Sequence, residues 1–448
     1  MPLETMNESL IHRLPTEILR QIFIAHGTTN DITTLRGTRV PAFKIASICS
    51  YWRSLAFVTT NLWNTISLVV ITAGPNVRWH SKNYPLVQRL VDLSGNSPLY
   101  INIKISGVEI PPIVCLLCDQ SHRWQTLSLF CSTLSHFQFI NSLSLDSLQI
   151  FRFTLNFMLF DSYHIKAPKL HTVSLSLLPT WHKPILPSLP WKQITDLTIK
   201  AGYAFQIHKA LSQMPNISKL NIRVYPDSLD NSYYQTSITS NLTSLTVLFS
   251  HAIEEKGLQH FFDSLLLPRL AFLALVSEPY AGNKDGELWS RTHLPSLLTR
   301  SSAVLTSFTL GNTLIDTTDL IHLLHLMPKL TTLALSEPPE GKLMINRVFL
   351  LSLVPKSDSD SNSQELVPSL ESLSLKISHR STLSSDSFNM TTFRDLIISR
   401  SNLKSVELKT SHDSLSLDSD ILRSLIDIRM KGVALRIKDK DGDVLFRR

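Results

Sequence analysis

The sequence predicts an α/β protein, with a small helical domain at the N-terminus and a repetitive strand–helix body after it. Three observations lead to this prediction. A short apolar pattern recurs through most of the chain, apolar segments of helical length lie between its copies, and the first 60 residues follow helical periodicity instead. Of the 448 residues, 43% are hydrophobic and 18% are charged, so the chain can bury a large core and is not expected to be disordered.

The recurring pattern is an apolar residue, two variable residues, an apolar residue, one variable residue and a third apolar residue. Alternation of apolar and variable positions is typical of a strand with one buried face. LTTLAL and LESLSL are clear copies, and successive copies begin 22 to 40 residues apart. The thirteen copies begin at Trp63, Pro98, Trp124, Leu148, Leu170, Ile194, Ile217, Leu242, Leu270, Leu305, Leu330, Leu370 and Leu403.

Apolar segments of helical length precede several copies. They cover residues 207–214, 258–267 and 318–327, and in each case a proline, which cannot continue a helix, follows before the next strand. Strand, loop, helix and strand, with a period in the high twenties, is the leucine-rich-repeat arrangement, in which parallel strands form a curved sheet with one face open to solvent. We therefore predict an irregular solenoid of this kind, ending with a closing strand at residues 433–437.

Two amphipathic segments make up the predicted helical domain. Apolar residues recur at helical spacing in Leu14–Phe23, and residues 45–56 carry a second helical stripe after a polar loop at His26–Arg39. Two such helices bury too little surface to be stable alone, so they are expected to contact the repeats, a partner, or both. The predicted organisation is an N-terminal tail at 1–10, a helical domain at 11–62, a solenoid at 63–437 and a C-terminal tail at 438–448.

These N-terminal residues resemble the F-box proteins. LPTEILRQIF at Leu14–Phe23 matches the Leu-Pro-x-Glu-Ile-Leu-x-x-Ile-Phe opening of that family, and ICSYWRSLA at Ile48–Ala56 is similar to its second element, followed by Leu62-Trp63. The run Pro41–Leu68 looks like the fungal F-box-like proteins that carry irregular leucine-rich repeats. The insert at His26–Arg39 departs from the family pattern, as does an isoleucine where valine is usual.

The resemblance implies a substrate receptor of an SCF-type cullin–RING ubiquitin ligase. The F-box would bind a Skp-family adaptor by setting an apolar helix face into a groove, and the repeats would hold the protein to be ubiquitylated. The alternative is a leucine-rich-repeat interaction scaffold without ligase association, whose N-terminal helices pack inward. The residues that the resemblance assigns to the adaptor contact are Leu14, Pro15, Ile18, Leu19, Ile22, Phe23, Ile48, Trp52 and Leu55.

A substrate-binding face follows from the repeat pattern. If the strands stack in parallel, the variable residue between the last two apolar positions of each copy faces solvent. The candidates on this row are Arg152, Ser174, Thr198, Asn221, Thr246, Thr309, Ser374 and Glu407. Four aromatic residues of the long connecting segments are further candidates because Tyr and Trp are favoured at interfaces, although such residues also pack onto their own protein. They are Tyr233, Tyr234, Tyr280 and Trp289.

The sequence contains only weak motifs for metal binding or catalysis. Asp439–Asp443 resembles a fragment of a calcium loop but lacks the glutamate at the twelfth position, so a turn is expected. Three cysteines and either of two histidines have partial zinc-ligand spacing, but the apolar run around them favours buried thiols. They are Cys115, Cys118 and Cys131, with His122 or His136. We expect no metal or cofactor. The common nucleotide-binding, hydrolase and zinc-protease motifs are absent from the sequence, so we predict a non-enzymatic protein, leaving open a catalytic triad assembled only in space.

Charge and hydropathy indicate which classes of partner the protein is expected to bind. The net charge of +7 is mild, and no run of five Lys or Arg marks a nucleic-acid binder. No apolar stretch reaches the roughly 20 residues of a membrane-spanning helix, and the first ten residues contain two Glu and no signal-like region. Four cysteines are too few for a disulfide framework. We therefore expect a cytoplasmic or nuclear protein that binds proteins rather than nucleic acid or membrane.

Overall fold

The chain folds into two compact units, Met1–Ile194 and Thr195–Arg448, in the computed structural model. Each unit is mixed α/β and is built on a mostly parallel sheet. The structure describes residues 11, 14–27, 29–33, 37–71, 80–106, 110, 112–132, 135–155, 165–177, 188–225, 237–249, 261–278, 292–313, 315–338, 344–355, 365–378, 388–410, 418–440 and 442–446.

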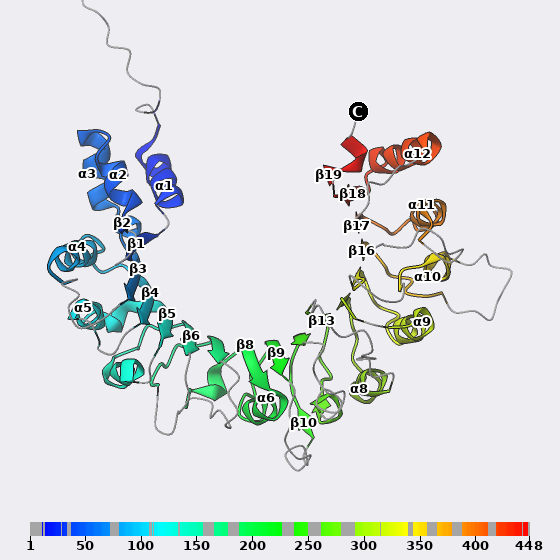
Figure 1. Ribbon diagram of the computed structural model, residues 1–448, viewed down its shortest axis with the longest axis horizontal. Coiled ribbons are helices and arrows are strands. Elements are labelled where there is room, and N and C mark those ends of the chain that lie inside the picture. The colour runs from blue at the N-terminus through cyan, green and yellow to red at the C-terminus, as the bar shows by residue number, and fades with distance from the viewer. Residues whose placement is uncertain are drawn as a thin grey trace, which may run out of the picture. The chain divides into compact units, whose positions relative to one another are not determined.

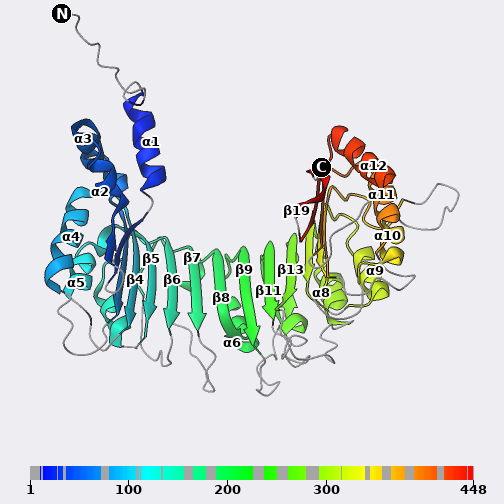
Figure 2. The same cartoon turned by 45° about the horizontal axis from the view of Figure 1, so that its top comes forward.

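The sheet of the first unit has the strand order β2-β1-β3-β4-β5-β6-β7. All neighbours are parallel except β1 and β2, which are antiparallel, and Figure 2 shows β4 to β7 side by side. The strands are β1 (Asn30–Thr33), β2 (Gly37–Arg39), β3 (Thr65–Ile71), β4 (Leu99–Ser106), β5 (Trp124–Cys131), β6 (Ile150–Leu155) and β7 (Thr172–Leu177).

Short helices connect these strands. Figure 1 shows α4 and α5 on the same side of the strands. Later connections use 3-10 helix, either single turns, as in η3 and η5, or the eight-residue η4. The connecting helices are α4 (His80–Leu93), α5 (Pro112–Cys118), η3 (Ser121–Arg123), η4 (Ser135–Ser142) and η5 (Trp191–Gln193).

The N-terminal helical region consists of α1 (Thr16–His26), α2 (Pro41–Ala46), α3 (Ser50–Val58) and η2 (Thr60–Leu62). The second predicted helical stripe is therefore two helices. Ser47 ends α2, and Cys49 adopts an extended backbone and caps α3, its Sγ accepting a hydrogen bond from the Trp52 N–H at 3.4 Å. A cysteine cap is rare, so the apolar periodicity alone did not reveal this break.

The prediction of a polar loop at His26–Arg39 is wrong, because this insert forms the hairpin β1–β2. Strand β1 pairs in parallel with β3, and Ile32 on β1 is fully buried. Asn30 is also fully buried, and its side-chain amide donates to the carbonyls of Leu62 and Thr65 at 3.3 and 3.1 Å. The insert thus extends the sheet and joins it to the helical region.

The sheet of the second unit has the strand order β8-β9-β11-β13-β14-β15-β16-β17-β18-β19. Its neighbours are parallel up to β18, and β18–β19 is an antiparallel hairpin. The strands are β8 (Asp196–Tyr203), β9 (Lys219–Tyr225), β11 (Ser244–Phe249), β13 (Phe272–Ser277), β14 (Ser307–Gly311), β15 (Thr332–Ser336), β16 (Ser372–Ile377), β17 (Ser405–Thr410), β18 (Ala434–Asp439) and β19 (Gly442–Asp443), beside a separate parallel pair, β10 (Ile238–Thr239) and β12 (Leu265–Leu266).

Helices cover one face of the second sheet. Figure 1 shows α8 to α12 along the same side of strands β13 to β18. Their apolar residues and the inward residues of the strands form the core; Leu333 and Leu335 on β15, for example, are at most 2% exposed. The helices are α6 (Ala204–Leu211), α8 (His293–Ser301), α9 (Thr317–His325), α10 (Arg347–Leu353), α11 (Met390–Ser399) and α12 (Ser419–Met430), with the 3-10 turn η7 (Val444–Phe446) at the end.

All thirteen predicted strand segments form strands, and the predicted closing strand is β18. Two predicted helices correspond to α6 and α9. The prediction for residues 258–267 is wrong at its C-terminal end, where β12 lies. There the backbone of β12 pairs with β10, which leaves those peptide groups unable to continue a helix. Asp439 and Gly442 pair in the final hairpin, so the turn expected there is confirmed. Among the described helices, none is long and apolar enough to cross a membrane.

Candidate functional site

Helix α1 carries apolar residues on two sides. Leu19 and Phe23, four residues apart, are 0% and 1% exposed and face the interior of the helical region. Ile18 and Ile22 recur at the same spacing on another side and are each 42% exposed, and Leu14, two residues before the helix begins, is 36% exposed. A helix that is apolar on more than one side is normally buried on all of them. The exposed side of α1 is therefore the first candidate for a partner contact.

Helix α3 supplies the inner contacts of α1. The rings of Trp52 and Phe23 lie 4.8 Å apart, tilted by 51°, and Leu55 is 5% exposed. The Thr16 and Tyr51 hydroxyls lie 3.4 Å apart and link the start of α1 to α3. Within the described part of the chain, the buried indole N–H of Trp52 has no hydrogen-bond partner. An indole N–H usually has a partner when it is buried, so this one is incompletely satisfied.

The nine residues assigned to the adaptor contact separate into two groups. Leu19, Phe23 and Leu55 lie in the core of the helical region, so they have no surface left for a partner and are corrected to packing residues. Trp52 is half-buried against Phe23. The exposed members are Leu14, Pro15, Ile18, Ile22 and Ile48.

Four more exposed apolar residues belong to the same region and were missed. Ile11 precedes α1 and Ile24 lies near its C-terminal end, while Tyr51 and Val58 lie on α3. Ile11 precedes Ile18 by seven residues, which is a helical repeat that could have indicated it. Val58, at the last position of α3, is 63% exposed, comparable to the 61% of Ile48 in the α2–α3 connection.

The predicted substrate row is a continuous line of side chains in each unit. In the first unit Arg152 is paired in register with Ser128 and Ser174. In the second unit the row contains Ala274 and Ala334 between the predicted residues. None of the eight predicted residues is buried, and those of the second unit are, in strand order, Thr198, Asn221, Thr246, Thr309, Ser374 and Glu407.

Glu407 is the acidic member of this row. Its carboxylate accepts hydrogen bonds from the Ser374 hydroxyl at 3.2 Å and pairs with Lys409 at 2.9 Å. The hydrogen bond from Lys409 lowers the pKa of Glu407, against the opposing effect of partial burial, and the charge of Lys438 adds to the lowering. Glu407 is therefore ionised in a locally positive environment.

Two other sets of sequence candidates, the aromatic residues of the connecting segments and the cysteines, add no site to the described part of the structure. Tyr233, Tyr234, Tyr280 and Trp289 lie outside the described residues. Cys115 is exposed, Cys118 is half-buried and Cys131 is buried, and burial raises the pKa of Cys118 and of Cys131 to about 12. Thiols of such high pKa are poor nucleophiles and metal ligands at neutral pH. Where the chain is described, no cluster of three or more His, Cys, Asp or Glu side chains could hold a metal ion.

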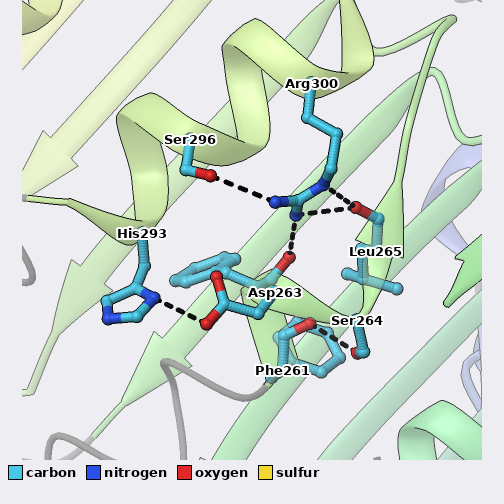
Figure 3. A network of polar contacts seen from close by, with 8 residues as sticks. Phe261, Asp263, Ser264, Leu265, His293, Ser296 and Arg300 are labelled. Atoms are coloured by element: carbon cyan, nitrogen blue, oxygen red, sulfur yellow. Dashed lines mark hydrogen bonds and ion pairs between the residues drawn. The ribbon is translucent and has the colours of Figure 1, made fainter. Parts of the chain in front are cut away.

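One cluster does bring His, Asp and Ser together, beside α8 (Figure 3). His293 Nδ1 lies 2.7 Å from the Asp263 carboxylate. Arg300 donates to the carbonyls of Phe262 and Leu265 at 2.7 and 3.0 Å and to the Ser296 hydroxyl at 3.1 Å. These contacts run from α8 to the segment that carries β12, so the cluster fastens a helix to its neighbouring strand.

Comparison with known proteins adds no relative. No protein-family model matches the chain, and no curated protein is similar to it in sequence. The two exposed surfaces described above, the outer side of α1 and the polar face of the sheets, therefore carry the functional argument.

Proposed function

We propose that this protein is a substrate receptor of an SCF-type cullin–RING ubiquitin ligase. In this proposal the N-terminal helices are an F-box that binds a Skp-family adaptor, and the sheet face of an irregular leucine-rich-repeat solenoid binds a protein substrate. The observation that carries the proposal is the exposed apolar side of α1, formed by Ile18 and Ile22, together with the exposed Leu14 just before the helix. It coincides with the segment that resembles the opening motif of the F-box family.

The energetics support a protein partner at α1. Burying a fully exposed Leu or Ile side chain contributes about 1.5–3 kcal/mol, so burying the 36–42% of these side chains that is still exposed would contribute roughly 1 kcal/mol each. The packing of Leu19 and Phe23 already holds α1 in place. A helix face that is ordered before binding loses little further conformational entropy on docking. The apolar side of α1 is thus prepared to dock into a groove on a helical partner.

The hairpin β1–β2 supports the receptor role in a second way. It lies between α1 and α2 in sequence, and β1 pairs with β3, the first repeat strand. The helices and the first repeats consequently belong to one compact unit. A receptor has to hold its substrate at a defined distance from the ligase, and this backbone pairing is suited to that task.

Co-purification of the full chain with a Skp-family adaptor tests the proposal. The variant Leu14→Ala/Ile18→Ala/Ile22→Ala truncates partly exposed side chains and leaves the buried Leu19 and Phe23 in place, so it should still fold. Each truncation at an interface costs on the order of 1 kcal/mol or more, so the triple variant should weaken binding by about a hundredfold or more. Binding of the wild type that is lost in this variant is the expected result.

A matched control comes from the second unit. Val348, Leu351 and Ile398 on α10 and α11 are 51–59% exposed, more than the three residues of α1. The variant Val348→Ala/Leu351→Ala/Ile398→Ala should therefore bind the adaptor as the wild type does. Equal loss in both variants, or no binding by a folded wild type, would contradict the ligase proposal.

One observation favours the alternative, an interaction scaffold without ligase association. Leu19, Phe23 and Leu55 pack inward, as expected if the helices mainly serve the protein's own core. The same co-purification separates the two functions, because a scaffold would bind proteins through its sheet face and ignore the adaptor.

A further inference from the structure

Three lysines stand side by side on the exposed face of the second sheet. Lys376 on β16 is paired in register with Lys409 on β17, which is paired in register with Lys438 on β18. All three side chains are exposed. Arg436, also exposed, lies two residues before Lys438 on the same face. We call Lys376, Lys409 and Lys438 the lysine row.

The strand repeat does not require lysine at this register position. Where the same register position continues into the neighbouring strands of the second unit, it holds Ser336 on β15 and Gly311 on β14. Adjacent strands are about 4.8 Å apart, and like charges directly opposite each other on paired strands are destabilising. Three neighbouring ammonium groups therefore cost the fold stability that small polar residues would not.

Only part of this charge is balanced. Among the described residues, Glu407 pairs with Lys409 and also feels the charge of Lys438, and Asp443 lies directly opposite Lys438 in the β18–β19 hairpin, whereas Lys376 forms no salt bridge. The cation Arg223, at the same register on β9, instead forms an ion pair with Glu278. The lysine row thus keeps a positive excess that a bound anionic group would neutralise.

We propose that the lysine row binds an acidic, extended segment of a partner protein. An extended chain advances about 3.3 Å per residue, so roughly four consecutive residues span the three strands, and the two of them that face the sheet can place their carboxylates among the three lysines. Charge complementarity of this kind sets the orientation of a partner and speeds its association.

The neighbouring groups favour a peptide over a nucleic acid. Glu407 lies within the patch, where it would repel a continuous line of phosphates but can accept hydrogen bonds from the backbone N–H groups of a peptide. Ser372 and Ser374, on the same face of β16, offer further polar contacts. A mixed surface of cations, two carboxylates (Glu407 and Asp443) and hydroxyls matches a peptide that carries both acidic side chains and amide groups.

The inference names the class of partner that the sheet face would bind. It rests on the proposed function only in that this partner would then be the ligase substrate. Its test measures peptide binding by the full chain without any adaptor. A negative result in the peptide experiment therefore says nothing about adaptor binding, and a negative result in the adaptor co-purification says nothing about peptide binding. The probe is a short fluorescein-labelled peptide with four consecutive acidic residues, measured by fluorescence anisotropy. The comparison probes are the same peptide with amides in place of the carboxylates and a single-stranded oligonucleotide of equal charge.

The decisive variant is Lys376→Glu/Lys409→Glu/Lys438→Glu. Its control, Arg347→Glu/Arg423→Glu/Lys431→Glu, changes exposed cations on or next to α10 and α12 and gives the same net charge. We expect the row variant to weaken binding of the acidic peptide by about tenfold or more and the control to change it less than about twofold. The amide peptide should bind about as weakly as the row variant binds the acidic one.

Three results would overturn the proposal. The acidic peptide does not bind the wild type, the two variants weaken binding equally, or the oligonucleotide binds more tightly than the peptide in a way that depends on the row. The variant Lys376→Gln/Lys409→Gln/Lys438→Gln serves if the glutamates disturb folding. It removes the repulsion, so it should fold at least as stably as the wild type and still lose binding.

Discussion

The side-chain amide of Asn30 donates a hydrogen bond to the backbone carbonyl of Thr65, 3.1 Å away, and so joins the N-terminal insert to the first repeat strand. The same amide donates to Leu62, and the side chain is fully buried. A single polar side chain thus couples the helical region to the sheet, which makes it a sensitive test of the fold.

Replacing Asn30 should destabilise the first unit. Asn30→Ala removes the donor of both hydrogen bonds, one buried and one partly buried, with an expected loss of about 1–3 kcal/mol in the free energy of unfolding. Asn30→Asp should cost more, because it sets a carboxylate against two carbonyl oxygens. Asn61→Ala, at an exposed position, is the control. In urea unfolding followed by circular dichroism, the loss of stability should be largest for Asn30→Asp, smaller for Asn30→Ala and smallest for the control. Equal unfolding midpoints for all three variants would show that the hydrogen bonds of Asn30 are unimportant.

Gly27 should not tolerate a larger side chain. A Cβ at this position would lie 2.5 Å from Leu62 Cδ1 and 3.1 Å from the Phe23 carbonyl oxygen. Gly27→Ala should therefore destabilise the protein by about 1–3 kcal/mol through overpacking. The cost should shrink in a Leu62→Ala background, and a double-mutant cycle measures this coupling. Additive effects would indicate that Leu62 is not the residue in the way.

Arg400 should contribute more to stability than Arg300. The guanidinium of Arg400 is 3% exposed and donates to the carbonyls of Leu353, Leu366 and Val367 at 2.6–2.7 Å. Arg400→Ala leaves three buried carbonyls without donors, for an expected loss of more than about 3 kcal/mol. Arg300→Ala, in the more exposed cluster of Figure 3, should cost less. Thermal unfolding of both variants tests the ranking, and a reversed order would contradict it.

Glu337 should make stability depend on pH. Burial raises the pKa of this carboxyl to about 7 from its ordinary value of 4.5, although hydrogen bonds from the N–H groups of Ile345, Ser378 and Met344 act in the opposite direction. The folded state therefore binds the proton more tightly than the unfolded state. Its stabilising contribution is complete below pH 4.5 and is lost as the pH rises to about 7, by about 3 kcal/mol.

The variant Glu337→Gln removes this titration. The melting temperature of the wild type, relative to that of the variant, should fall between pH 5 and pH 8. A constant offset between the wild type and Glu337→Gln over this pH range would contradict the raised pKa.

The repeat strands could be predicted because their signal is local. An apolar alternation such as LTTLAL buries one face of a strand whatever its neighbours are, and Leu333 and Leu335 are buried accordingly. The exposed row followed from the same alternation, so its members, from Arg152 to Glu407, lie in register within each unit.

The rest depended on contacts between distant residues. Strand β1 contains Asn30 and Asp31, which favour turns, and becomes a strand only because β3 offers it a partner. The division of α1 into buried Leu19 and Phe23 and exposed Ile18 and Ile22 is likewise set by the position of α3, since all four residues are apolar. The lysine row was invisible for the same reason: Lys376, Lys409 and Lys438 are some thirty residues apart in sequence and meet only through strand register.

The pairing of β1 with β3 has a consequence for anyone who wishes to handle the repeats alone. A shortened chain that began at residue 63 would expose the edge of β3 along residues 66–69, with the peptide N–H and C=O groups that now pair with β1 left free. Such an edge recruits strands from other copies, so the shortened protein would aggregate rather than report on substrate binding. The two activities proposed for this molecule, adaptor binding and substrate binding, are better separated by surface substitutions than by truncation.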